Sequence, residues 1–270
     1  MNKAGGRGRP LFPLYIGFIL LIMYIPILLV IVYSFNQSRL TAVWGGFTLA
    51  WYAEVFRDTA MFEGLINSLI LGLLSSGLAA VLGTLGASGM ARVRASVSAP
   101  PGGFHRIMES LSILPIMVPE IIMGMTFLAF FSLLSIPSGM FTLVMAHTAF
   151  CLPYPYLLVR ARLAGLDKSC VEAARIMGAS AMRAFCDITL PLILPAVFSG
   201  MLISFAMSFD DVIVSSFVAG VNSNTLPMII YSRLKAGVTP KTNAMCTLLF
   251  VLTVVLCFAA ARLARNGKKD

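Results

Sequence analysis

Three carboxylates, Glu120, Asp210 and Asp211, lie within long apolar stretches of the sequence. An ionised carboxylate at the centre of a membrane span costs on the order of 2.5–3.5 kcal/mol on insertion scales, so each needs a partner, water or a use. No Lys or Arg lies inside the spans predicted below. Neutralisation must therefore come from protonation, water, a partner subunit or a cationic solute. We expect the acids to serve a cationic cargo, the alternative being protonated or hydrogen-bonded packing groups.

The residues around the two aspartates predict a polar helix face. Small and polar side chains recur at spacings of four, four, three and four, at Gly200, Ser204, Ser208, Asp211 and Ser215. These spacings place them on one face of an α-helix, which we interpret as the lining of a wet path. Asp210 is rotated by about 100° from Asp211. One acid can therefore meet the cargo while the other holds a neighbouring helix.

The composition indicates a membrane protein. Of 270 residues, 59% are hydrophobic and only 11% are charged, with a mean hydropathy of +0.91; a soluble domain carries about a quarter charged residues. The net charge of +9 does not indicate nucleic-acid binding, because the basic residues cluster at the ends of apolar segments. The five cysteines show no metal-ligand spacing, so no metal site or disulfide is predicted.

Six apolar segments predict an all-α transmembrane fold with six spans. They cover about 11–35, 64–91, 107–134, 140–159, 192–219 and 244–261. We divide the chain into a tail at 1–10, a membrane domain at 11–263 with a loop at about 164–191, and a tail at 264–270. In the third span Pro115 and Pro119 are expected to break the hydrogen-bond ladder of the helix, with Glu120 directly after the second break.

The basic residues predict the orientation. With six spans both termini share one side, and that side holds fifteen of the twenty Lys and Arg residues. The positive-inside rule then places both termini and the 164–191 loop in the cytoplasm.

The polar interval at 172–191, EAARIMGASAMRAFCDITLP, predicts a docking segment of two short helices. Ser169 and Glu172 have the spacing of a capping box. Gly178 is placed to end the first helix, and Ser180 to cap a second one running toward Pro191. Ala173 and Ala174 keep one helix face slim enough for another protein's groove. The alternative is an ordinary cytoplasmic helical hairpin.

This interval resembles the EAA motif of ABC-importer permeases, which docks into the ATPase subunit: E-A-A, three residues, Gly178, nine residues, then Ile188-x-Leu190-Pro191. Further stretches resemble the permeases of spermidine/putrescine importers. They are IVYSFNQSRL (31–40), the Trp51-Tyr52 pair, HTAFCLPY (147–154), SFDDVIVSSFVAG (208–220) and LPMIIYSRLKAGVTPKTNA (226–244).

The resemblance implies a type I (MetI-like) importer permease in the bacterial inner membrane. A second permease subunit, favoured to be a different chain, two ATPase subunits and a periplasmic polyamine-binding protein are its implied partners. The positions matching Trp51, Glu172, Ser208, Asp210 and Asp211 are implicated in polyamine uptake in that family. An acid is also kept at Glu120, where the family has Asp, one methylene shorter.

A polyamine carries amines along an apolar chain, so aromatic rings would suit it as well as carboxylates. Trp51, Tyr154 and Phe209 are the candidates, although each is explained more simply as an interfacial or packing residue. For coupling to the ATPase we single out Ser169, Glu172, Ala173, Ala174, Gly178, Leu190 and Pro191.

The sequence contains no G-x-x-x-x-G-K-[ST] motif, so ATP and Mg²⁺ are expected on a partner ATPase and no cofactor is expected here. An intramembrane aspartyl protease is disfavoured, because adjacent acids on one helix point apart and His105 and His147 have no obvious nucleophile partner. An ion-coupled secondary transporter would explain the acids but leave the cytoplasmic motif without a use. The sequence leaves open whether putrescine, spermidine or another small cation is carried.

Overall fold

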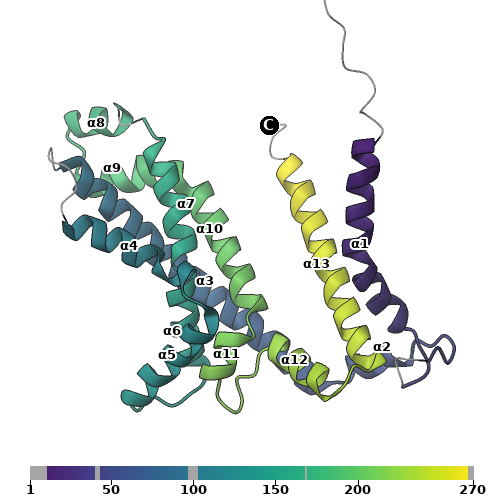
Figure 1. The fold of residues 1–270 in the computed structure, drawn as a ribbon. Coiled ribbons are helices and arrows are strands. Elements are labelled where there is room, and N and C mark those ends of the chain that lie inside the picture. The colour runs from purple at the N-terminus through teal and green to yellow at the C-terminus, as the bar shows by residue number, and fades with distance from the viewer. Residues whose placement is uncertain (1–10, 40–42, 97–102, 168, 267–270) are drawn as a thin grey trace, which may run out of the picture. The chain divides into compact units, whose positions relative to one another are not determined.

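The computed structural model describes residues 11–39, 43–96, 103–167 and 169–266, and this part of the chain is largely helical (Figure 1). The elements in chain order are α1 (Leu11–Tyr33), α2 (Ala50–Phe56), α3 (Thr59–Ser96), α4 (Gly103–Met117), α5 (Glu120–Leu133), α6 (Met140–Cys151), α7 (Pro153–Ala164), α8 (Ser169–Ile176), α9 (Ala181–Ala184), the π-helical turn η1 (Phe185–Thr189), α10 (Leu190–Asp210), α11 (Ile213–Val218), α12 (Leu226–Ala236) and α13 (Pro240–Asn266). The predicted tail at 1–10 and the end of the second tail lie outside the described residues.

The helix lengths suit a membrane protein. In the part of the chain that the structure describes, four stretches are long and apolar enough to cross a bilayer: Pro13–Tyr33, Thr59–Val93, Met140–Ala164 and Ala181–Asp210. The pair Arg106–Met117 and Glu120–Leu133 passes the same test when taken together. The apolar part of α13, Pro240–Val255, is shorter. The arrangement is compatible with six spans, and the number six stays a prediction.

The third predicted span consists of two helices bent by 110°. The break falls at Pro119, which has no N–H to donate and holds the residue before it out of the helical region. Glu120 is consequently the first residue of α5. Pro115 lies inside α4, which continues to Met117, so its missing N–H interrupts the hydrogen-bond ladder without ending the helix. On α4, Glu109 forms an ion pair with Arg160 of α7.

The fifth span also differs from the prediction. A continuous helix over 192–219 was expected, but α10 ends at Asp210 and a separate short helix, α11, begins at Ile213. The side chain of Asp211 explains this break, because its carboxylate accepts N–H groups in the first turn of α11.

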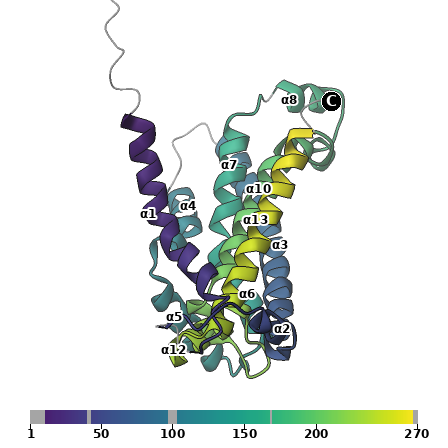
Figure 2. The ribbon, with the colours of Figure 1, turned by 90° about the vertical axis from the view of Figure 1, so that its right-hand side faces the viewer.

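The chain forms two compact units, one of Phe62–Ile229 and one of Met1–Met61 with Ile230–Asp270. In the first unit α7 and α10 lie side by side (Figure 1 and Figure 2). Gly200 of α10 faces the backbone of Pro155 so closely that a Cβ there would collide with it. Tyr156, Val159 and Ile193 form the buried core of this contact. Small residues let helix backbones approach closely in lipid, which explains the glycine here.

In the second unit α13 packs against both α1 and α2. The loop after α1 is tied by Asn36, whose side-chain amide donates to the carbonyl of Val43 (2.9 Å) and whose side-chain oxygen accepts from the N–H of Gly45 (2.8 Å). Asn36 also pairs with Phe47 in an isolated antiparallel bridge. These bonds fix the segment that leads into α2.

Replacing Gly200 with Ala is expected to destabilise the α7–α10 contact, because the added Cβ meets backbone rather than a side chain that can move aside. Overpacking of this kind costs about 1–3 kcal/mol. We expect a lower midpoint of heat-induced aggregation for the detergent-purified chain. The matched control is Gly77→Ala on α3, where a Cβ has no atom within 4 Å. Equal midpoints for the two variants would contradict the close contact.

Candidate functional site

A cluster of polar side chains lies buried in the unit Phe62–Ile229, with the imidazole of His147 on α6 at its centre. Nδ1 of His147 lies 2.8 Å from Oγ of Ser208 on α10, and Nε2 lies 3.1 Å from Oγ of Ser215 on α11. Oγ of Ser208 is in turn 2.9 Å from Oγ of Ser75 on α3. The cluster therefore joins four helices through hydrogen bonds that water does not reach.

Asp211 lies at the gap between α10 and α11 and accounts for it. Its Oδ1 accepts the N–H of Val214 (3.2 Å), and its Oδ2 accepts both the N–H (2.7 Å) and the hydroxyl (2.8 Å) of Ser215. Nε2 of His147 lies 3.5 Å from the same Oδ2. The first N–H groups of a helix attract a carboxylate. The backbone at Asp211 is extended (φ −68°, ψ 130°), so α10 ends before it. The carboxylate then accepts N–H groups in the first turn of α11, and the predicted span is divided into two helices.

The other two predicted acids are placed differently. Asp210 is the last residue of α10 and is exposed. Glu120 is the first residue of α5 and is also exposed. The side chain of Asp211, by contrast, is only 5% exposed. Adjacent acids thus point apart, and contact of any of the three with cargo stays a prediction.

The polar face predicted as a wet path is packed inside the chain. The hydroxyl of Ser204 donates to the carbonyl of Cys151 (3.1 Å), and Sγ of Cys151 donates to the carbonyl of Ser204 (3.4 Å). Ser208 and Ser215 bond to His147 as described, and each of the three serines is 2% exposed or less. Their side chains hold α10 and α11 to α6 in this geometry. A role of these three serines in the passage of the transported solute stays a prediction.

Each of the three aromatic candidates lies on a different helix. Trp51 on α2 is half-buried, and its Nε1–H donates to the carbonyl of Asn36 (2.8 Å). Phe209 on α10 stacks with Phe205 at a centroid distance of 5.8 Å. Tyr154 on α7 is half-buried. Trp51 belongs to the other compact unit, and a role of each in cargo contact stays a prediction.

An ion-pair network holds the helix that carries Trp51. The carboxylate of Asp58 receives the guanidinium of Arg233 on two oxygens (2.8 and 2.9 Å) and the ammonium of Lys241 (3.0 Å). Lys241 also pairs with Glu54 of α2 (3.1 Å). The hydrogen bond from Arg233 lowers the pKa of Asp58 from 3.8 to about 2. The carboxylate therefore stays charged and links α2, α12 and α13.

In the predicted docking segment, the expected helix end at Gly178 is confirmed. Gly178 has a φ of +90°, a conformation that residues with a Cβ rarely adopt. Its N–H donates to the carbonyl of Arg175 (3.1 Å), and the N–H of Ala179 donates to that of Ala174 (3.0 Å). This is a Schellman motif. The predicted cap of the next helix is confirmed too, since Oγ of Ser180 accepts the N–H of Arg183 (3.2 Å).

The predicted capping box between Ser169 and Glu172 is replaced by another contact. Helix α8 already includes Ser169 as its first residue, and Oδ1 of Asp167 accepts the Ser169 N–H (3.0 Å). This bond lowers the pKa of Asp167 below its usual value. Glu172 is left exposed in the first turn of α8, where a negative charge is favoured by the helix dipole.

The segment presents an exposed surface. Ala173 is exposed and Ala174 is half-buried. The large apolar side chains Ile176 and Met177 are 87% and 88% exposed. The chain then passes through η1, whose wider turn continues into α10 at Leu190 and Pro191. A cytoplasmic docking role for these residues stays a prediction.

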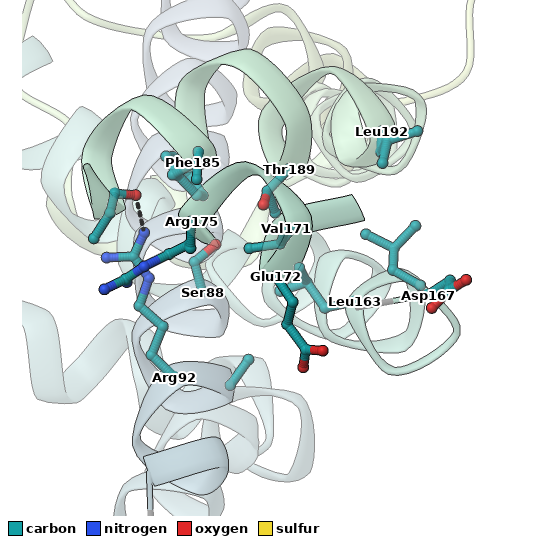
Figure 3. A pocket seen from close by; sticks show the side chains of 14 residues that line it. Ser88, Arg92, Leu163, Asp167, Val171, Glu172, Arg175, Phe185, Thr189 and Leu192 are labelled. Carbon is teal, nitrogen blue, oxygen red and sulfur yellow. Dashed lines mark hydrogen bonds between the residues drawn. The ribbon is translucent and has the colours of Figure 1, made fainter. Parts of the chain in front are cut away.

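A cavity of about 390 Å³ lies between α3 and this segment. Figure 3 shows Arg92 reaching it from α3, and Glu172 and Arg175 reaching it from α8. Arg92 donates to the carbonyl of Ala181 (3.3 Å) and lies over the ring of Phe185, 5.3 Å from its centroid. Through these contacts α3 holds the segment at α9 and η1.

Sequence reasoning did not predict His147 as the centre of this buried cluster, because it considered the residue only as a catalytic base. Its partners Ser208 and Ser215 are 61 and 68 residues away. The available signal was the histidine itself, a polar ring in an apolar span that must find hydrogen-bond partners.

Comparison with known proteins gives a consistent result. The family model described as binding-protein-dependent transport system inner membrane component matches residues 83–266. The chain is 36% identical over 263 residues to the putrescine transport system permease protein PotI of Escherichia coli K12, covering 95% of this chain and 91% of that protein. It is 38% identical over 245 residues to the spermidine/putrescine transport system permease protein PotC of Haemophilus influenzae, covering 91% and 93%.

Solved structures share the fold. A chain of a bacterial ABC transporter that imports the polysaccharide alginate matches with a TM-score of 0.70 at 14% identity, covering 97% of this chain and 99% of that one. A chain of the MetNI methionine ABC transporter matches with a TM-score of 0.63 at 19% identity, covering 81% and 98%. The predicted all-α, MetI-like fold class is confirmed.

Replacing Asp58 with Asn is expected to lower the thermal unfolding midpoint at neutral pH, because Arg233 and Lys241 lose their shared carboxylate. Since the folded-state pKa lies below the ordinary value, this stabilisation is present above pH 3.8 and is lost as the pH falls toward about 2. The difference in thermal unfolding midpoint between wild type and Asp58→Asn should therefore become smaller as the pH falls over that range.

The intrinsic fluorescence of Trp44 and Trp51, both in the same unit as Asp58, would follow the unfolding. The control is Glu54→Gln, whose side chain is 51% exposed and for which a loss under about 1 kcal/mol is expected. A midpoint difference that does not change with pH would rule out the carboxylate as its source.

Proposed function

Because the chain belongs to the family of binding-protein-dependent transport system inner membrane components, we propose that it is a permease subunit of an ATP-driven polyamine importer. The observation that carries this proposal is the identity of 36–38% to putrescine and spermidine/putrescine permeases over more than nine tenths of the chain. A conserved fold alone would leave the cargo open, because the similar solved structures belong to importers of alginate and methionine.

The exposed acids support a cationic cargo. Asp210 and Glu120 are carboxylates at helix ends within the membrane domain, and the predicted spans contain no Lys or Arg to neutralise them. The ammonium groups of a polyamine would supply the missing positive charge. Pairing with these carboxylates would offset the cost of moving either charge out of water. Asp211 has its hydrogen bonds within the chain and serves to shape the site.

Coupling to ATP hydrolysis is proposed to run through the segment from Ser169 to Pro191. Its first helix offers Glu172 and Ala173 on an exposed surface, followed by the apolar side chains of Ile176 and Met177. An ATPase subunit bound there could move α8, and the η1 turn leads that motion directly into α10. The other partners are a second permease chain, a second ATPase subunit and a periplasmic binding protein, in a bacterial inner membrane with both termini of this chain cytoplasmic.

Asp210→Asn is expected to lower polyamine uptake about ten-fold, because the substitution leaves an ammonium group of the cargo without its charged partner. The measurement is uptake of labelled putrescine and spermidine into proteoliposomes containing the complete importer, with its binding protein and ATP. Glu63→Gln, an exposed acid at the start of α3, is the matched control and should transport normally. Unchanged uptake in Asp210→Asn would remove this acid from the pathway. If the wild-type importer took up a different cation and neither polyamine, the proposal that the cargo is a polyamine would be refuted.

Glu172→Ala is expected to abolish the stimulation of ATP hydrolysis by the loaded binding protein, or to release the ATPase from the complex. The reason is the loss of the one carboxylate in the first turn of α8. Cys170→Ala, on the same helix and equally exposed, serves as the control. ATPase stimulation and copurification at wild-type levels in Glu172→Ala would contradict coupling through this segment.

A further inference from the structure

Helix α6 lies across the break between α10 and α11 and holds both sides of it. His147 contacts Ser208, two residues before the end of α10, and Ser215, inside α11. At one end of α6, the hydroxyl of Thr142 donates to the carbonyl of Val218 at the end of α11 (2.9 Å). At the other end, Cys151 and Ser204 of α10 exchange hydrogen bonds. Three contacts along α6 thus hold α10 and α11 in place, although the helical backbone is interrupted between them.

Among these contacts only His147 touches both sides of the break at once. The bonds of Asp211 to its own chain run forward, to Val214 and Ser215. They start α11 but do not reach α10. The direction in which Asp210 points from the end of α10 therefore depends on His147, which bridges Ser208 and Ser215.

The hydrogen-bond directions show how the ring does this. The hydroxyl of Ser215 donates to Asp211, so its oxygen is left to accept a hydrogen bond from the Nε2–H of His147. In the neutral ring Nδ1 is then the acceptor for the hydroxyl of Ser208. Both ring nitrogens are used, and the ring is fully buried. An apolar side chain of similar size would fill the space and leave Ser208 and Ser215 without these partners.

We propose that His147 is a positioning residue for cation transport, which sets the direction of the exposed Asp210 by holding the end of α10 to the start of α11. This inference rests on the proposed function, in which Asp210 meets the cargo. His147 itself has no exposed surface and does not touch the cargo. Its effect on transport should therefore pass through Asp210.

The test is a double-mutant cycle in the complete reconstituted importer. His147→Leu is expected to lower putrescine uptake several-fold, and by no more than the roughly ten-fold loss expected for Asp210→Asn, because it acts only through the placement of that acid. In the Asp210→Asn background the same substitution should add little, because the group that it positions is already absent. Multiplicative losses in the double variant would overturn the proposal.

A second measurement reports position directly. Asp210→Cys is introduced in a chain whose natural cysteines, except the buried Cys151, are replaced. Its rate of reaction with a water-soluble maleimide is compared with and without His147→Leu. The rate is expected to change several-fold, and His147→Gln, which can still donate and accept, should restore most of it. An unchanged rate in His147→Leu would overturn the proposal.

Thr148→Val is the matched control. Thr148 is buried on the same helix, but its hydroxyl donates within α6, to the carbonyl of Val144 (2.7 Å). Uptake and labelling should both stay at wild-type values, and a loss equal to that of His147→Leu would assign the effect to general packing of α6. If His147→Leu fails to copurify with its partners, Ser208→Ala and Ser215→Ala, which remove the two hydrogen-bond partners of the ring, replace it. Wild-type labelling in both would overturn the proposal.

The two proposals fail separately. A wild-type complex that takes up no polyamine refutes the proposed function. Polyamine uptake that is unaffected by Asp210→Asn removes this acid from the pathway, and with it the positioning role of His147. Normal uptake that depends on Asp210, combined with independent effects of His147, refutes only the positioning role.

Discussion

The structure of the larger unit depends on one constraint, which is that backbone N–H groups inside a membrane protein must find acceptors within the protein. The carboxylate of Asp211 meets this need for the first N–H groups of α11 and so permits a helix to end at Asp210 and another to begin. A break at this depth would otherwise expose unpaired polar groups. The buried cluster around His147 then fixes how the two helices meet.

The same constraint explains why the chain keeps so many buried hydroxyl groups. Ser75, Ser204, Ser208 and Ser215 are small enough to let helices pack closely, and each has a hydrogen-bond partner across or along a helix. Gly200 performs the steric part of this role against Pro155. Close packing and polar pairing together hold α6, α7 and α10 as one body, and Asp210 is exposed at the end of α10.

The docking segment follows a different logic, because its structure is set by local bonds. The Schellman motif at Gly178 and the cap at Ser180 each involve residues within five positions of one another. A short helix followed by a turn can therefore keep its shape while presenting exposed apolar side chains such as Ile176 and Met177. A rigid, exposed element of this kind is suited to transmit the movement of a partner.

The sequence by itself determined the class of the protein, most of the helices, the break at Pro119 and the helix end at Gly178. Each of these follows from composition or from bonds between near neighbours. It could not determine that the polar face from Ser204 to Ser215 is buried, that Asp211 starts a helix, or that Asp167 takes the place expected of the Ser169–Glu172 pair. It also could not place His147, whose partners come from helices more than sixty residues away. Periodicity shows that side chains share a face, and only the packing of other helices against that face decides whether it meets water or protein.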